Sequence, residues 1–490
     1  MNATAKLEIS VLAAALTLGI IGDALLRSFP WGVNFALWAG LLAAAIYFLG
    51  RERAQAFSSG GGWLMLPVVL SPAAFLWHES TALKALSMLC LLTALSLVML
   101  RAQGSRLRTS SLVKYAVGGV IAGFNTGFGA LALIFGNTEW KKSFVGTSRH
   151  GLAVVRGVAF SLVPLLIFGS LLMAADAVFK SLIHNLLHFD FTHLALVAFL
   201  TFWAGGYLRG ILFGKELSLG AQKVAPPALL GAIDMGVLLG LLDFLFLAFV
   251  AVQFRFFFGG SALVHSTTGL TYSEYARRGF FQLLAVAALL LPFLLMVHWL
   301  LRPDDASAQR LFKWLAGFQI ALLFVIMASA LQRLRLYQTE YGLSEQRLYP
   351  TAFLGWLAVV FIWFCLTVLR GHRERFAFGA MVAGFLLVAT LHAINPDALI
   401  ARTNIERARS GLPFDAHYVS SLSADAVPEI LAGLQSLNPV DRRKLAKAIL
   451  ENWAPGGNPD WRSWNLSGAQ ARQAIAEHEA ELRADCAKIP

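Results

Sequence analysis

Long apolar runs dominate this sequence and limit what it can fold into. A helix needs about 20 mostly apolar residues to cross a lipid bilayer. Eleven runs of roughly that kind are present, at residues 7–26, 31–49, 63–77, 81–100, 157–175, 194–213, 231–254, 280–301, 314–331, 351–370 and 377–394. Only 14% of the residues are charged, against about 25% in a typical soluble domain. The pattern predicts an all-α, polytopic membrane helical bundle of about 11 transmembrane helices, and it excludes an ordinary soluble enzyme.

The distribution of Lys and Arg orients these runs, because cytoplasmic loops of membrane proteins carry an excess of basic residues. With eleven spans and a cytoplasmic N-terminus, 20 of the 29 basic residues before residue 395 fall in inner loops and 9 in outer loops. If the Gly-rich segment 115–136 also crossed, the counts would become 14 and 15. We therefore expect 115–136 to be interfacial or re-entrant, and the C-terminal tail to lie on the periplasmic face of a bacterial inner membrane.

Charge content also divides the chain into regions. Before residue 395, 45 of 394 residues are charged, whereas 23 of the last 96 are charged, which is near the soluble average. We predict an N-terminal four-helix membrane segment over 1–100, a cytoplasmic loop over 101–156, a seven-helix membrane core over 157–394, and a small helical soluble tail over 395–490. The membrane part carries a net charge of +13 and the tail −1. The basic surplus therefore reports topology, and we expect no nucleic-acid partner.

Local signals predict where three helices begin, and prolines predict a distortion in a fourth. Asn438 followed by Pro439 is typical of a helix N-cap and first position. Ser467 with Gln470 has the spacing of a capping box, and Ser423 is expected to cap a helix that begins near Asp425. The third apolar run is short and contains Pro67 and Pro72, so we expect a kinked or tilted helix that needs its neighbours to satisfy backbone groups.

One acidic residue lies deep inside an apolar run. Asp243 is halfway along 231–254, where a charge costs several kcal/mol unless it is paired or faces water. It is either an ion- or proton-coupling carboxyl in a polar pathway, or a hydrogen-bonded carboxyl packed against a neighbouring helix.

The densest polar cluster is expected on the outer face, where three segments meet. Its candidate binding residues are Gln253, Arg255, Tyr272, Glu274, Arg277, Arg278, Arg333, Arg335 and Tyr341. Glu274 completes a capping box, whereas Arg277 and Arg278 oppose the local helix dipole and need an anionic partner. The two arginines either pair with Glu274, or they form part of a site for an anion or a lipid headgroup.

Signals for catalysis and metal binding are weak. The sequence contains no phosphate-binding loop, dinucleotide-binding motif or HExxH, so we predict no catalytic residues and no cofactor. His184 and His188 share a helix face, but no third ligand is placed with them and we predict no metal site. The three cysteines are scattered and form no disulfide framework.

Several of these stretches resemble a family of uncharacterised, polytopic bacterial inner-membrane proteins that is known only as a domain of unknown function. The similar stretches are Ala174–Phe179, Phe249–Arg255, Gly269–Phe281, Ser329–Tyr337, Tyr341–Ser344, Asn395–Asp397 and Leu422–Pro428. The resemblance covers most of residues 156 to 430. It implies a many-span membrane protein and no particular activity.

Our leading hypothesis is a membrane protein that handles a solute, an ion or a lipid headgroup, with Asp243 as its buried charge. The expected partners are the lipid bilayer, an anionic headgroup or a small solute, and a periplasmic protein bound by the tail. One alternative is a membrane-embedded envelope enzyme of the lipid-linked transferase type, which the absence of an acid in the first outer loop, 27–30, disfavours. The other is a sensor or assembly scaffold that acts through the tail.

Overall fold

The computed structural model describes residues 3–52, 62–102, 191–213, 230–268, 272–302, 304–453 and 460–487, together with Leu172 and a few residues between 115 and 129. Side chains at 253–278 are outside this description. The described elements are helices, so the predicted all-α fold is confirmed. They form three groups, each with its own hydrophobic core.

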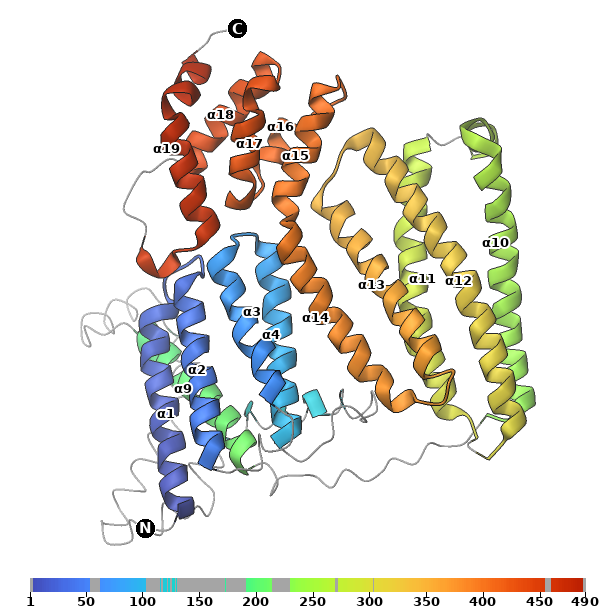
Figure 1. Ribbon diagram of the computed structural model, residues 1–490, viewed down its shortest axis with the longest axis horizontal. Helices are drawn as coiled ribbons and strands as arrows, with labels where there is room; N and C mark the ends of the chain where they lie inside the picture. Colours follow the sequence, from blue (N-terminus) through green and yellow to red (C-terminus); the bar gives the residue numbers. More distant parts are fainter. Residues whose placement is uncertain are drawn as a thin grey trace.

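The first group packs five helices around one core (Figure 1). These are α1 (Ala3–Leu26), α2 (Val33–Glu52), α3 (Met65–Trp77, preceded by the 3₁₀ turn Gly62–Leu64), α4 (Thr81–Ala102) and α9 (Phe191–Phe213). Small residues let α1 and α9 approach closely, because a side chain at Gly19 would collide with Thr201. The sequence predicts that residues 157–394 form a separate membrane core. In the structure, α9 falls within that range but packs against α1 of the N-terminal segment.

The second group contains the five helices that follow α9. They are α10 (Ala232–Thr268), α11 (Tyr272–Leu300), α12 (Ala306–Tyr341), α13 (Glu345–Thr367) and α14 (Phe376–Ile394, preceded by the 3₁₀ turn Arg373–Arg375). Large side chains such as Phe312, Phe361 and Phe364 fill the core of this group. Helix α14 also contacts α4 and so joins the two groups.

Nine of the described helices are long and apolar enough to cross a membrane. The short α3 carries Pro72 inside the helix, and together these ten helices coincide with ten of the eleven predicted runs. The remaining run, 157–175, lies outside the described residues apart from Leu172.

The described helices alternate in direction except at one place, where α4 and α9 run the same way. Helices α1, α3, α10, α12 and α14 run toward the end of the bundle that carries the C-terminal domain, and α2, α4, α9, α11 and α13 run away from it (Figure 1). We call this the docking end; the N-terminus lies at the opposite end. Helix α4 finishes far from the docking end and α9 begins close to it, so the chain between Ala102 and Phe191 joins the two ends.

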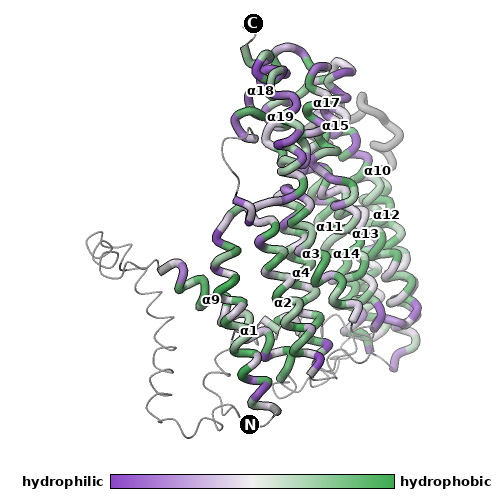
Figure 2. Tube along the Cα trace, turned by 60° about the vertical axis from the view of Figure 1, so that its left-hand side comes forward, coloured by the Kyte–Doolittle hydropathy of each residue, from purple (hydrophilic) through white to green (hydrophobic). Residues whose placement is uncertain are grey.

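The third group is a small helical domain on the docking end. It contains α15 (Pro396–Arg409), α16 (Ala416–Ser420), α17 (Val427–Gly433), α18 (Pro439–Trp453) and α19 (Leu466–Ala487), with 3₁₀ turns η5 (Ala424–Ala426), η6 (Leu434–Ser436) and η7 (Trp461–Ser463). Hydrophilic residues are frequent here, whereas the bundle helices are mostly hydrophobic (Figure 2). The change in composition reflects a domain that buries its own core outside the bundle.

The caps of this domain test the local predictions. The predicted N-cap at Asn438 is confirmed, since its Oδ1 accepts hydrogen bonds from the backbone N–H groups of Val440 at 3.1 Å and Asp441 at 2.9 Å. The prediction for Ser467 is wrong: α19 begins at Leu466, and Asn465 Oδ1 accepts the hydrogen bond from Gly468 N at 2.7 Å.

Ser423 also fails as a capping side chain. It stands before η5, as predicted, but its side chain makes no cap hydrogen bond. The hydroxyls of Ser423 and Ser467 are both engaged by buried carboxylates instead. A buried carboxylate competes successfully for these hydroxyls because it is a charged acceptor that must be satisfied.

Replacing a core phenylalanine should separate protein packing from contact with lipid. Phe361 is fully buried in the second core, and Ile362 beside it is 51% exposed on the outside of the bundle. Phe361→Ala is expected to lower the free energy of unfolding by about 3–5 kcal/mol, because it leaves a cavity. Ile362→Ala should cost about 0.5 kcal/mol or less. Denaturation of the detergent-solubilised protein measures both, and equal losses would contradict this packing.

Candidate functional site

The C-terminal domain rests on three turns at the docking end. Val33 N, after the α1–α2 turn, donates to Trp464 O at 2.9 Å. Leu343 N, in the α12–α13 turn, donates to Asn404 Oδ1 at 2.9 Å, and Glu345 N donates to the phenol oxygen Oη of Tyr418 at 2.8 Å. The third turn, between α3 and α4, meets a buried polar cluster. We call this cluster the seam and define it as His78, Ser80, His392, Asp397, Ser423, Asp425 and Ser467.

Asp425 is the centre of the seam and is 4% exposed. Its carboxylate accepts hydrogen bonds from the Ser467 hydroxyl at 2.7 Å, from Glu79 N at 2.7 Å and from Ser80 N at 2.9 Å, as well as from His78 Nδ1. The two backbone donors immediately precede α4, so the carboxylate lies at the N-terminal end of this helix. A carboxylate at this position also interacts favourably with the helix dipole.

His78 links this carboxylate to the bundle. Its Nδ1 faces Asp425, and its Nε2 lies 3.1 Å from the backbone oxygen of His392. Both ring nitrogens therefore face oxygen acceptors, an arrangement that only the doubly protonated imidazolium satisfies with two donors. Ser87 Oγ and His392 Nε2, 2.8 Å apart, add a buried hydrogen bond between α4 and α14.

Asp397 is the second buried acid of the seam, 2% exposed. The hydroxyl of Ser423 contacts its Oδ2, and Ser423 N donates to the same oxygen at 3.3 Å. Within the described part of the chain, its Oδ1 has no hydrogen-bond partner. Burial raises the pKa of this carboxyl above its ordinary value, although the hydrogen bonds from Ser423 act in the opposite direction.

Asp243 lies in α10, away from the seam. It is 5% exposed, and neither of its carboxylate oxygens has a hydrogen-bond partner among the described residues. Gln319 of α12 is fully buried, and its amide oxygen and nitrogen are likewise without partners there.

Asp243 and Gln319 lie at similar depths. A side chain at Gly236 of α10 would touch Leu311 of α12 at 3.0 Å, and the two helices run in the same direction. Because an α-helix rises 1.5 Å per residue, Asp243 lies about 10 Å and Gln319 about 12 Å beyond this contact. Two buried and unsatisfied polar side chains thus occupy one level of adjacent helices.

The predicted outer cluster is only partly brought together. Gln253 and Arg255 fall in α10, and Tyr272, Glu274, Arg277 and Arg278 in the first turns of α11, all with side chains outside the description.

The remaining members of that cluster lie on α12. The guanidinium of Arg333 lies against Gly279 of α11, and Arg335 is exposed. Tyr341 contacts Tyr337, with ring centroids 5.0 Å apart, and Arg347 lies 4.2 Å from the Tyr337 ring. These aromatic residues adjoin the turn on which the C-terminal domain rests.

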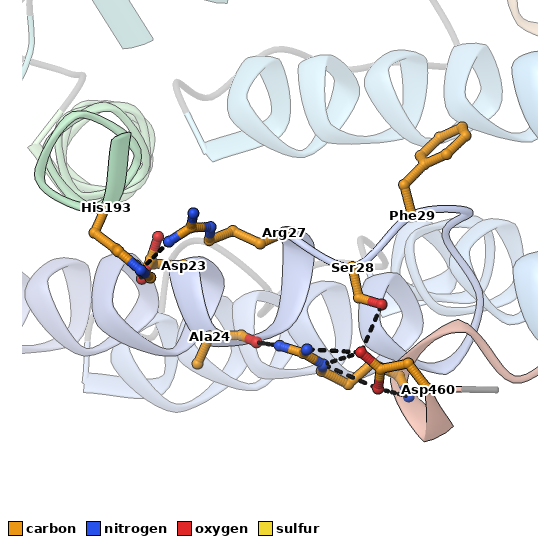
Figure 3. A pocket seen from close by; sticks show the side chains of 8 residues that line it. Asp23, Ala24, Arg27, Ser28, Phe29, His193 and Asp460 are labelled. Carbon is orange, nitrogen blue, oxygen red and sulfur yellow. Dashed lines mark hydrogen bonds and ion pairs between the residues drawn. The ribbon is translucent and has the colours of Figure 1, made fainter. Parts of the chain in front are cut away.

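A pocket of about 480 Å³ opens beside the first turn of the docking end (Figure 3). Its lining residues are Asp23, Ala24, Arg27, Ser28, Phe29, His193, Asp460 and Arg462. His193 Nδ1 lies 2.6 Å from Asp23 Oδ2, and Arg462 bonds to both Asp460 and the Ala24 carbonyl. The hydrogen bonds from Arg462 hold the pKa of the Asp460 carboxyl well below its usual range. Asp23 Oδ1 has no hydrogen-bond partner in the described chain.

The pocket also shows where one of the three clustered histidines lies. His193 contacts Arg27 and Asp23, whereas His184 and His188 lie outside the described residues. Among the residues that the structure describes, no group of three or more His, Cys, Asp or Glu side chains could hold a metal ion.

Sequence reasoning missed the seam because its members are separated by hundreds of residues. His78 and Asp425, for example, are 347 positions apart. A usable signal was nevertheless present, since Asp397 and Asp425 fall in stretches that carry the family resemblance.

In the described part of the chain, ten apolar helices followed by a hydrophilic helical domain define a multi-pass α-helical membrane protein. The chain belongs to the family described as a domain of unknown function, DUF4153, whose model matches residues 65–433. The match contains Asp243 and all seam residues except Ser467. Comparisons with curated proteins and with solved structures gave no significant match.

Removing the charge of Asp425 should strongly destabilise the docked domain. Asp425→Asn leaves the His78 imidazolium buried without its counter-ion, and breaking a buried pair in this way costs about 3–5 kcal/mol. Glu406→Gln is the control, since Glu406 makes an exposed pair with Arg409 at 3.3 Å, worth less than about 1 kcal/mol. Unfolding and limited proteolysis of the full chain measure the difference; equal effects would contradict a buried pair.

The same pair predicts how docking depends on acidity. Burial would raise the pKa of Asp425, but its hydrogen bonds from His78 and Ser467 hold the pKa at about 2. An unfolded Asp titrates near pH 3.9, so the folded pKa is depressed. The stabilisation is therefore complete above about pH 4 and is lost as the pH falls toward 2. Stability measured from pH 6 to pH 2 should fall less steeply in Asp425→Asn than in the wild type.

Proposed function

We propose that this protein moves a proton or a small cation, alone or with a solute, across the bacterial inner membrane, with Asp243 as the intramembrane carboxyl. One observation carries the proposal. Asp243 is buried in a helix long and apolar enough to span the membrane, and both of its oxygens lack partners among the described residues. A structural carboxyl at this depth would be expected to hydrogen-bond to a neighbouring helix, whereas ionisable groups inside membranes commonly mark ion pathways.

Gln319 supports the same interpretation. A buried amide without hydrogen bonds costs free energy unless a ligand or water satisfies it. An amide and a carboxyl at similar depth on adjacent helices supply donors and acceptors for a proton, a hydrated cation or a small polar solute.

The proposed orientation follows from loop charge. The loops at the end opposite the C-terminal domain include Arg51, Arg302, Arg310, Arg373 and Arg375, and basic loops favour the cytoplasm. We propose that the N-terminus is cytoplasmic and the C-terminal domain periplasmic. Helix α4 ends away from the docking end and α9 begins at it (Figure 1), and the sequence contains one further apolar run, 157–175, between them.

Neutralising Asp243 tests the proposal directly. In liposomes containing the purified protein, Asp243→Asn is expected to abolish the proton or Na⁺ flux that follows an imposed gradient, as measured with ion-sensitive dyes. Stability should stay equal or rise, because a neutral amide costs less to bury than a carboxylate.

Asp234→Asn is the matched control, since Asp234 is exposed in the first turn of the same helix and accepts a hydrogen bond from Gly231 N at 3.1 Å. It should retain the flux. A wild-type protein that carries neither ion, or an Asp243→Asn variant that carries both normally, would overturn the proposal.

A second candidate function, recognition of a phospholipid headgroup, is favoured by the pocket of Figure 3. The pocket lies at the ends of two membrane helices, next to Phe29, which is 81% exposed. Its two arginines and two aspartates balance in charge, which suits a zwitterion. Arg27 would bind the phosphate and Asp23 Oδ1 the amine of an ethanolamine headgroup.

Lipid analysis of the purified protein tests this second function. Arg27→Ala is expected to lose phosphatidylethanolamine that co-purifies with the wild type, as quantified by mass spectrometry. Arg51→Ala, at the opposite end of α2, should retain it. If both variants keep the same amount of this lipid, the pocket does not recognise its headgroup.

A further inference from the structure

Three buried oxygen atoms of the seam region lie near one another and have no hydrogen-bond partner among the described residues. They are Asp397 Oδ1, Ser80 Oγ and Tyr349 Oη. Ser80 and Asp397 are 1% and 2% exposed. The Ser80 hydroxyl lies near both Asp397 and Tyr349 as a hydrogen-bonding neighbour and lowers the pKa of the Asp397 carboxyl, although neither contact has full hydrogen-bond geometry.

The three groups come from different parts of the fold. Ser80 precedes α4, Tyr349 is in the second turn of α13, and Asp397 is in the first turn of α15. They therefore converge where two bundle helices meet the C-terminal domain. Leaving three polar oxygens unsatisfied in one buried place is costly, because each loses its hydrogen bonds to water without replacement.

Two acids, Asp425 and Glu345, interact electrostatically with the Asp397 carboxyl. Asp425 already has a cationic partner in His78, whereas the contacts that Asp397 makes in the described chain come from the hydroxyl and backbone of Ser423. A carboxylate in this environment needs a positive charge.

We propose that Asp397, Ser80 and Tyr349 bind a monovalent cation of the Na⁺ class where the C-terminal domain meets the bundle. Carboxylate, hydroxyl and phenol oxygens are hard ligands that suit alkali and alkaline-earth ions. One carboxylate balances one positive charge, which favours a monovalent ion over Ca²⁺ or Mg²⁺. The bound ion would hold α4, α13 and α15 together and so strengthen docking. This site stands apart from Asp243 and does not depend on its proposed role.

Thermal unfolding of the full chain in detergent tests the site. With NaCl replacing choline chloride at constant ionic strength, the Tm of the wild type should rise by a few degrees and saturate, because an ion that binds the folded state stabilises it. KCl and CaCl₂ are run in parallel to establish which ion binds. Ser80→Ala should leave the Tm in choline nearly unchanged, since its hydroxyl makes no hydrogen bond, yet it should weaken the Na⁺ response.

Two further variants make the result decisive. Asp397→Asn should abolish the Na⁺ response, whereas Asp243→Asn should keep it in full, whether or not the protein carries ions across the membrane. The proposal is overturned if no cation shifts the Tm of the wild type, or if both Ser80→Ala and Asp397→Asn respond as the wild type does. It is also overturned if the Tm follows pH but not Na⁺, since a proton would then occupy Asp397 in place of the cation.

Discussion

The buried carboxylate of Asp425 is the contact on which the arrangement of bundle and C-terminal domain depends. Removing a carboxylate from water is costly unless hydrogen bonds and an opposite charge replace the solvent. Here the replacement comes from His78 and the backbone N–H groups of Glu79 and Ser80, just before α4, on one side, and from Ser467 of α19 on the other. The Asp425 carboxylate and its donors on the bundle would lack hydrogen-bond partners if they were apart. The domain and the bundle must therefore dock in one register.

The sequence predicts those parts of the fold that depend on local patterns. The bilayer sets the length of an apolar helix, and ten predicted runs accordingly coincide with described helices. The Asn438 cap depends only on the four consecutive residues 438–441 and is also predictable. The capping predictions at Ser467 and Ser423 fail because their hydroxyls donate hydrogen bonds to carboxylates from other segments. The packing of α9 against α1 is likewise set by small residues facing each other across distant parts of the chain.

The candidate sites also differ in how much of them the local sequence predicts. Asp243 could be found from the sequence because a charge inside an apolar run is conspicuous, but nothing local indicates that Gln319 lies at its level. Tyr341 shows the opposite case. It was expected in an anion site, whereas the structure places it beside Tyr337 and Arg347, at the turn that supports the C-terminal domain. Tertiary contacts determine which of two chemically reasonable roles a polar residue takes.

Helix α12 connects the two buried polar regions. Midway along it, Gln319 lies at the level of Asp243, and at its end the turn containing Gly342 and Leu343 rests on Asn404 of α15. Gly342 has a φ of +77°, and a side chain there would collide with Asn404, so the turn fits the domain closely. Coupling between sites needs a shared element that both can bias. A shift of α12 on ion binding near Asp243 would have to move or break this contact, and the C-terminal domain would then respond to events inside the membrane.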